Sequence, residues 1–136
     1  MNGAATGGVR LLLRVEGACV LAAALFFYSK AAFGWGLFAL CFLAPDLSFF
    51  GYLAGARIGA LAYNVAHSYV GPVVCFIAAS AFVQPALSGG AIIWAAHVGF
   101  DRALGYGLKY TAGFGHTHLG RIGRQAEPGA LRQSSA

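Results

Sequence analysis

The stretch Trp94–Tyr110, WAAHVGFDRALGYGLKY, begins as an apolar helix and ends as a basic segment suited to a membrane surface. His97 and Asp101 stand four residues apart in it, so a helix places both side chains on one face. Trp94 and Leu104 extend the same stripe. A histidine and a carboxylate inside an apolar span carry a high free-energy cost in lipid. We therefore expect other parts of the chain to supply partners for them.

The composition is that of an integral membrane protein. Of the 136 residues, 59% are hydrophobic and only 10% are charged, and the mean hydropathy is +0.70. Soluble domains carry about 25% charged residues, so this chain lacks the charge that a soluble surface requires. The net charge of +5 comes from Lys and Arg that flank apolar runs, a pattern of lipid-headgroup anchoring rather than of nucleic-acid binding. The three cysteines are isolated in apolar runs without CxxC spacing, which predicts packing roles.

The apolar runs predict an all-α fold, a single bundle of four transmembrane helices within residues 1–123. Pro45 and Pro72 predict kinks in the second and third spans, because proline removes a backbone donor. Arg10 and the apolar run after it also resemble a signal peptide, but Lys30 in the cleavage region favours an uncleaved helix. We expect spans at about 9–28, 33–53, 58–83 and 91–104, an interfacial segment over 105–123 and a disordered tail over 124–136.

The distribution of positive charge predicts the orientation in the membrane. Four spans place both termini and the connection 51–59 on one side, and Lys30 alone on the other. The positive-inside rule therefore predicts that both termini are cytoplasmic. The basic residues expected on the cytoplasmic side are Arg10, Arg14, Arg57, Arg102, Lys109, Arg121, Arg124 and Arg132.

Polar residues recur at similar depths in the four spans. Measured from the cytoplasmic ends of their helices, at about 1.5 Å per residue, they lie roughly 9–18 Å deep. A four-helix bundle brings such positions together in its core. We predict that His67, His97 and Asp101 converge there, with Asp46 and Glu16 alongside. Asn64 and Tyr63 share the helix face of His67 in the motif AYNVAHSYVGP.

Purely structural interpretations remain open for these residues. Asp46 follows Pro45 and could cap a restarted half-helix. Glu16 could lie at the interface beside an arginine. Asn64 and His67 could form hydrogen bonds between helices that only fix their register.

The chemistry of this set suits a divalent metal, since two histidines with carboxylates are ligands for Zn, Fe or Mn. The predicted metal ligands are His67, His97, Asp101 and His118. Asp46 or Glu16 would act as general base. His116 and His118 form an HxH pair, and on an extended chain both would point the same way. The predicted binding residues are Asn64, Tyr63, Arg102 and Lys109, of which the two cations would face anionic lipid headgroups.

Four motifs carry a resemblance to a known family. They are APDLSFFGYLAG (44–55), AYNVAHSYVGP (62–72), HVGFDRALGYGLKY (97–110) and THLGRIG (117–123). Together they resemble the family catalogued as domain of unknown function 4260, over roughly residues 10–123. The resemblance implies a small four-span protein of the bacterial inner membrane and implies no activity. His116 departs from the family pattern, which tends to have an acidic residue there, and this weighs against a metal role for His116 more than for His118.

Three classes of function follow from these observations. The first is a metal-dependent membrane hydrolase, which a fainter likeness to membrane-embedded metal-dependent hydrolases also favours. The second is a small proton-coupled carrier subunit that uses the same groups as a relay. It would need a homo-oligomer, because four helices make a narrow bundle and no inverted repeat is visible. The third is a non-catalytic membrane accessory protein. The lipid bilayer is the expected partner in each case.

Overall fold

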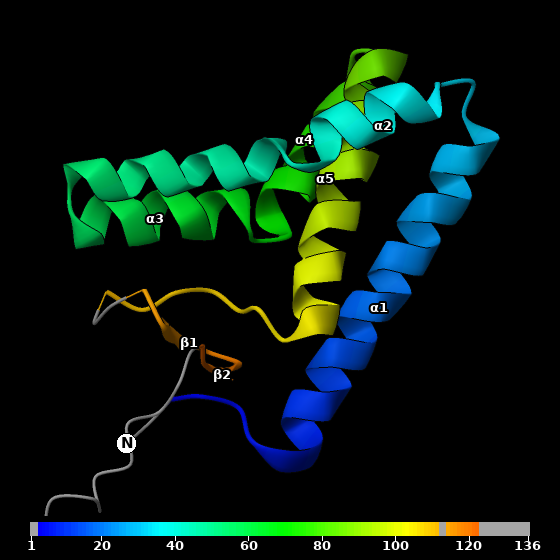
Figure 1. Ribbon diagram of the computed structural model, residues 1–136. Coiled ribbons are helices and arrows are strands. Elements are labelled where there is room, and N and C mark those ends of the chain that lie inside the picture. The colour runs from blue at the N-terminus through cyan, green and yellow to red at the C-terminus, as the bar shows by residue number, and fades with distance from the viewer. Residues whose placement is uncertain (1–2, 112–113, 123–136) are drawn as a thin grey trace, which may run out of the picture.

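The computed structural model describes residues 3–111 and 114–122 and is built from helices (Figure 1). The two short strands β1 (His116–Thr117) and β2 (Gly120–Arg121) pair antiparallel. The predicted all-helical class is therefore confirmed. The helices are α1 (Gly7–Lys30), α2 (Trp35–Phe42), the 3₁₀ helix η1 (Ala44–Ala54), α3 (Ala56–Ala66), α4 (Val70–Ala81) and α5 (Pro85–Leu104).

Helices α1 and α5 pack side by side along much of their length (Figure 1). Two glycines lie at their contact. A Cβ added to Gly17 would lie 2.4 Å from the Cβ of Arg102, and one added to Gly99 would lie 2.7 Å from the carbonyl oxygen of Gly17. Small residues let two backbones approach closely, which is a common basis of helix association in membranes. Helix α1 thus supports the helix that carries His97 and Asp101.

Helices η1 and α3 form a hairpin that extends to one side of the α1–α5 pair (Figure 1). Gly55 connects them with a φ of 112°, a conformation that favours glycine. A 3₁₀ helix has about 3.0 residues per turn, so Asp46, Phe49 and Tyr52 form one row along η1. The facing row on α3 is formed by residues at four-residue spacing, Gly59, Tyr63 and His67.

The two rows pack against each other residue by residue. The ring of Tyr52 covers Gly59, where an added Cβ would lie 2.3 Å from ring carbons. The ring centroids of Phe49 and Tyr63 are 5.2 Å apart. At the end of the rows, Asp46 reaches His67. The 3₁₀ geometry therefore aims the carboxylate at the histidine.

A short break with a bend separates helix α3 from helix α4. Residues 67–69 lie between them, and their axes differ by 46°. Pro72 stands in the first turn of α4, where a missing N–H costs least. Arg102 Nη2 donates a hydrogen bond of 2.7 Å to the carbonyl of His67, so a cation stands at the C-terminal end of α3, where the helix dipole favours it.

Several helices are apolar enough for a membrane. By length and hydropathy, α1 and the continuous stretch Trp35–Ala54 could each cross one, and the bent α3–α4 pair would be a third span. These helices indicate insertion into a membrane. Helix α5 is long enough but does not reach the same hydropathy, because it contains His97, Asp101 and Arg102. An arrangement with four spans stays a prediction.

The C-terminal segment, residues 105–111 and 114–122, turns back beside α3 towards the N-terminus (Figure 1). Gly105 ends α5 in a left-handed conformation, with a φ of 94°. The described part of the predicted interfacial segment thus contains paired strands and is packed on the protein. The backbone N–H of Ala5 donates a 2.7 Å hydrogen bond to the carbonyl of His118. The predicted disordered tail, 124–136, lies outside the described residues.

Candidate metal centre

Four side chains from three parts of the chain meet in one cluster. Asp46 comes from η1, His67 follows the last residue of α3, and His97 and Asp101 come from α5. Their facing nitrogen and oxygen atoms all lie within 4.8 Å of one another. His67 and His97 are 0% and 2% exposed, whereas the side chains of Asp101 and Asp46 are 13% and 38% exposed. The predicted convergence of these residues is confirmed. We call them the His/Asp cluster.

The separations of the two histidine nitrogens from each other and from the carboxylate oxygens are close to those of ligands around one metal ion. His67 Nε2 lies 3.2 Å from Asp46 Oδ1 and 3.5 Å from Asp101 Oδ2. His97 Nε2 lies 3.4 Å and 3.7 Å from the same two oxygens, and 3.1 Å from His67 Nε2. Nitrogen and oxygen ligands about 2.0–2.2 Å from a tetrahedral ion would be roughly 3.3–3.6 Å apart. Each carboxylate oxygen is therefore spaced to share one small cation with the two histidine nitrogens, and all four atoms lie within 4.8 Å of one another.

The hydrogen bonds of His67 orient the ring for this role. Its Nδ1 lies 2.9 Å from the carbonyl oxygen of Tyr63. A carbonyl can only accept, so Nδ1 carries the hydrogen and Nε2 of the neutral ring presents its lone pair to the cluster. The Tyr63 ring is stacked on His67, with centroids 3.8 Å apart and planes 11° apart. Metal-binding histidines commonly hold their second ring N–H in this way.

The surroundings of His97 are more apolar. Its ring contacts Phe42 edge to face, with centroids 5.2 Å apart. Its Nδ1 is buried, and none of the described residues gives it a hydrogen-bond partner. With both carboxylates ionised and both rings neutral, the cluster carries a charge of −2, a high cost away from water. A divalent cation or bound protons would neutralise it.

The four predicted binding residues bond to the protein itself, and Tyr63 and Arg102 contact His67. Tyr63 packs on His67, and Asn64 pairs with the backbone of Lys109. Arg102 donates to the carbonyls of His67 and Tyr106. Lys109 is 4% exposed, which lowers its pKa. Contact of these two cations with anionic headgroups stays a prediction.

An aromatic cage encloses the Lys109 ammonium group. Its Nζ lies 3.3 Å from the ring centroid of Phe114, 4.7 Å from that of Tyr63 and 5.6 Å from that of Phe49. It also donates a 3.0 Å hydrogen bond to the carbonyl of Phe114. Cation–π attraction strengthens when the cation is desolvated. The cage therefore anchors the C-terminal segment beside Tyr63.

Two other predicted site residues lie outside the His/Asp cluster. Glu16 is exposed on α1. His118 Nδ1 accepts a 2.8 Å hydrogen bond from the Leu108 N–H, and burial, together with the positive charge of Arg102, lowers the pKa of His118. His116 Nε2 instead accepts from Arg121 Nε at 3.2 Å. The chain turns after Thr117, so the two histidines of the HxH pair engage different partners.

Sequence reasoning missed the aromatic walls of the cluster. Phe42 contacts His97, and Phe49 packs beside both Tyr63 and the Lys109 ammonium group. The three-residue spacing of Asp46, Phe49 and Tyr52 after a proline is a signal that could have indicated the 3₁₀ row.

The apolar helices, which indicate insertion into a membrane, and the mostly buried His/Asp cluster together define the class: an apolar helical protein with a candidate metal centre. A family model described as Domain of unknown function (DUF4260) matches residues 10–122, and the chain belongs to this family. The matched range contains the whole His/Asp cluster. Searches of curated proteins and of solved structures each found no match to the chain.

Proposed function

We propose that the His/Asp cluster binds one divalent metal ion and that the protein is a metal-dependent membrane hydrolase. The observation that carries the proposal is the spacing of the two histidine nitrogens from each other and from one oxygen of each carboxylate, 3.1 to 3.7 Å, which is close to that of ligands around one ion. The ion pairs of both carboxylates are made with the two histidines themselves. Zn, Fe and Mn all accept imidazole and carboxylate ligands.

Burial divides the cluster into two roles. His67, His97 and Asp101 are the less exposed residues and would hold the metal, which matches the three protein ligands of catalytic zinc sites. Such a metal supplies a Lewis acid and lowers the pKa of a bound water to about 7. Asp46 is the most exposed member, with 38% of its side chain accessible. Its carboxylate would accept the proton of the attacking water as general base.

One observation favours a second candidate, a proton-sharing network without metal. The 3.1 Å distance between the two Nε2 atoms is also that of a hydrogen bond. If one ring carries a proton on Nε2, the pair could pass it between the two carboxylates. This function would fit a proton-coupled carrier subunit, or an accessory protein in which the network only holds the helices together.

Metal analysis of the detergent-purified protein separates these two candidates. After treatment with a chelator, we expect uptake of about one Zn, Mn or Fe ion per chain. Loss of an outer-shell partner costs about 10–100-fold in metal affinity, so His67→Ala and His97→Ala should each cost more. Glu16→Gln, a change of an exposed residue outside the cluster, is the matched control and should bind as the wild type does. A folded protein that takes up no metal would contradict the metal centre.

Hydrolysis is tested on the metal-loaded protein with chromogenic carboxylic and phosphoric esters in mixed micelles. We expect turnover that disappears with the chelator and returns with the metal. Asp46→Asn should keep most of the metal and lose roughly 10²–10⁴-fold in kcat, the usual contribution of a general base. Tight metal binding without turnover on either ester class would overturn the hydrolase and leave the metal centre.

A further inference from the structure

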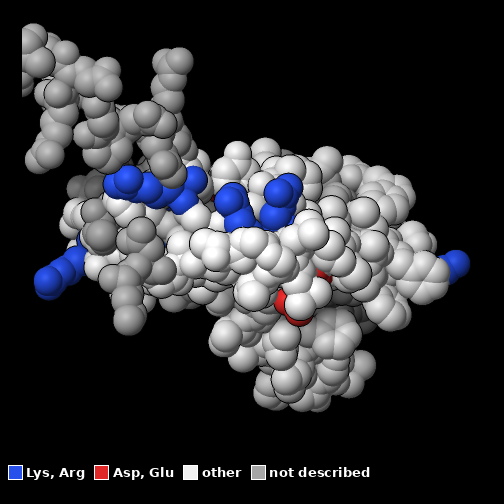
Figure 2. All heavy atoms as spheres, turned by 90° about the horizontal axis from the view of Figure 1, so that it is seen from below, with Lys and Arg blue, Asp and Glu red and all other residues white. Residues whose placement is uncertain are grey.

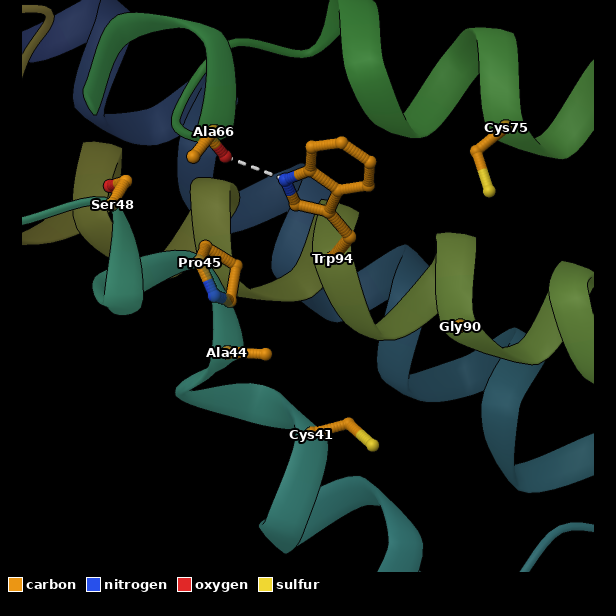
Figure 3. A pocket seen from close by; sticks show the side chains of 8 residues that line it. All are labelled: Cys41, Ala44, Pro45, Ser48, Ala66, Cys75, Gly90 and Trp94. Atoms are coloured by element: carbon orange, nitrogen blue, oxygen red, sulfur yellow. Dashed lines mark hydrogen bonds between the residues drawn. The ribbon is translucent and has the colours of Figure 1, made fainter. Parts of the chain in front are cut away.

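An apolar groove runs beside the His/Asp cluster. Helices α2 and α4 both pack on α5, but within the described residues they make no contact with each other. The gap between them is a pocket of about 460 Å³, within the range of roughly 300–1,000 Å³ that is usual for small-molecule sites. We call it the α2–α4 groove (Figure 3). Its lining residues are Cys41, Ala44, Pro45, Ser48, Ala66, Cys75, Gly90 and Trp94.

Several lining residues of the groove are neighbours of the cluster residues along the chain. Pro45 precedes Asp46, and Ala66 precedes His67. Trp94 lies one helical turn before His97, and its indole Nε1–H donates a 2.6 Å hydrogen bond to the carbonyl of Ala66 (Figure 3). The same backbone segments therefore form the wall of the groove and present three of the four cluster side chains.

The lining chemistry selects the occupant. The Ser48 hydroxyl is the one alcohol, amide or charged side chain among the eight lining residues, and the indole of Trp94 is already hydrogen-bonded to Ala66. The helices that border the groove expose large apolar side chains, such as Leu40 at 79% and Val74 at 60%. In a membrane these surfaces meet lipid chains. A hydrocarbon chain fits such a groove, and a polar ligand does not.

We propose that the α2–α4 groove binds the hydrocarbon chain of an amphiphilic lipid substrate and thereby presents its headgroup to the His/Asp cluster. This inference rests on the proposed function, because it names the substrate class of the same metal centre. The groove would position the scissile bond, and the metal centre and Asp46 would act on it. Binding energy from a remote, unreactive chain is then used to orient the reacting group.

Gly90 provides a variant that fills the groove without disturbing the fold. It lies within α5, lines the groove, and has no atom within 4 Å of the position of an added Cβ. Gly90→Leu therefore places a side chain in the open space. Gly36→Leu is the matched control, because Gly36 lies in a helix, is equally open and does not line the groove.

Trp94 provides the readout. The chain has two tryptophans, so Trp35→Phe leaves Trp94 as the one fluorophore of its kind. The probe is a fatty acid brominated along its chain, because bromine quenches tryptophan on contact. We expect saturable quenching of the zinc-loaded protein in detergent.

The Gly90→Leu variant should weaken binding of the probe. Each buried methylene is worth roughly fourfold in affinity, so expulsion of two or more carbons by Gly90→Leu should weaken binding on the order of tenfold. Gly36→Leu should change it less than twofold, about the scatter expected for a distant surface change.

Two results would contradict the proposal that the groove binds a hydrocarbon chain. One is quenching that rises linearly with the probe and is equal in all variants, which means simple partitioning into the micelle. The other is saturable quenching that Gly90→Leu leaves unchanged. Metal uptake measured on the same samples keeps the two proposals apart. Metal uptake without saturable quenching contradicts lipid binding in the groove and leaves the metal centre. Saturable quenching without metal uptake supports lipid binding in the groove and contradicts the metal centre.

Discussion

The Asn64 side chain makes both of the hydrogen bonds that a paired strand would make to one residue of the C-terminal segment, Lys109. Its side-chain oxygen accepts from the Lys109 N–H at 2.7 Å, and its amide nitrogen donates to the Lys109 carbonyl at 2.8 Å. One side chain thus satisfies both backbone groups of a residue that is 4% exposed. Buried backbone groups are nearly always paired, so the contact decides where this segment lies.

Asn64→Leu should release the C-terminal segment. The change leaves two backbone groups without partners, at about 1–3 kcal/mol for each group that stays buried. We expect a lower midpoint of thermal unfolding and faster proteolysis near Lys109. Ser68→Ala is the control, because the Ser68 hydroxyl makes an exposed contact of 3.4 Å with Val65, and such a change is usually within about 0.5 kcal/mol. Equal proteolysis of both variants would contradict the role of Asn64.

His118 makes the docking of the same segment depend on pH. Burial, together with Arg102, lowers the pKa of His118 below its ordinary value of 6.5, and its Nδ1 accepts from the Leu108 N–H. The undocked chain therefore binds the proton more readily than the docked one. By linkage, docking is at full strength above pH 6.5 and weakens as the pH falls below that value. Hydrogen exchange at Leu108, corrected for the intrinsic effect of pH, should show falling protection from pH 7.5 to about 5.

A glutamine at this position separates titration from packing. His118→Gln can still offer an oxygen to the Leu108 N–H but does not titrate. We expect its protection to be lower than that of the wild type at neutral pH and nearly flat across the same range. A wild-type protein whose protection does not change with pH would show that His118 does not control the docking.

At the scale of elements, the 3₁₀ helix is the feature that assembles the site. A continuous α-helix turns by 100° per residue, so Asp46, Phe49 and Tyr52 would diverge around its axis. The 3₁₀ helix keeps them in one row, facing His67, Tyr63 and Gly59. Runs of this length are uncommon, and here the packing of the two rows holds it.

Gly59→Ala tests this packing. The added Cβ would lie 2.3 Å from ring carbons of Tyr52, so the hairpin must open by enough to relieve the clash. Overpacking of this kind costs about 1–3 kcal/mol, and we expect a matching loss in thermal stability. Gly36→Ala, with no atom within 4 Å of the added Cβ, should be neutral or slightly stabilising because alanine favours a helix. A neutral Gly59→Ala would show that the rows do not need this close approach.

The elements also show what sequence reasoning can reach. The apolar runs predicted helices, and the cost of polar groups in lipid predicted that His67, His97 and Asp101 meet. That argument used the depth of each residue along its helix, however. The rotation of the helix about its own axis decides which residues face the core. Glu16 has a suitable predicted depth but lies on an exposed face of α1. The three-residue spacing of Asp46, Phe49 and Tyr52 is a weak signal for the 3₁₀ helix, because it extends over two turns of an apolar run that also suits an α-helix.

At the scale of the whole molecule, charge is distributed unevenly. Seen from the end where the strands lie, Lys and Arg side chains gather over part of the surface, and acidic side chains show in one small area (Figure 2). Arg10 and Arg14 at the start of α1 are exposed, as is Arg121 in β2. The turns after α1 and after α4 lie at the opposite end (Figure 1). This arrangement suits a protein whose basic end faces anionic lipid.

Reporter fusions test the predicted orientation. A reporter that is active only in the cytoplasm should work at either terminus and after Gly55, and it should fail in the turn at Gln84. The expectation follows from the positive-inside rule, since Lys30 alone marks the other side. An alkaline phosphatase fusion, active only outside the cytoplasm, is the converse control. Activity of the cytoplasmic reporter at Gln84 would refute the predicted orientation.

The origin of the cluster residues has a mechanical consequence. Asp46 and His67 belong to the η1–α3 hairpin, while His97 and Asp101 belong to α5. Two hydrogen bonds, from Trp94 to the Ala66 carbonyl and from Arg102 to the His67 carbonyl, also connect the hairpin to α5. A metal bound by residues of both parts would cross-link the hairpin to α5. At a free metal concentration of 100 times Kd, metal binding would stabilise the cross-linked form by about 2.7 kcal/mol. Without the metal, the hairpin would separate from α5 more often. The metal-free protein would therefore expose its own binding site to an incoming ion.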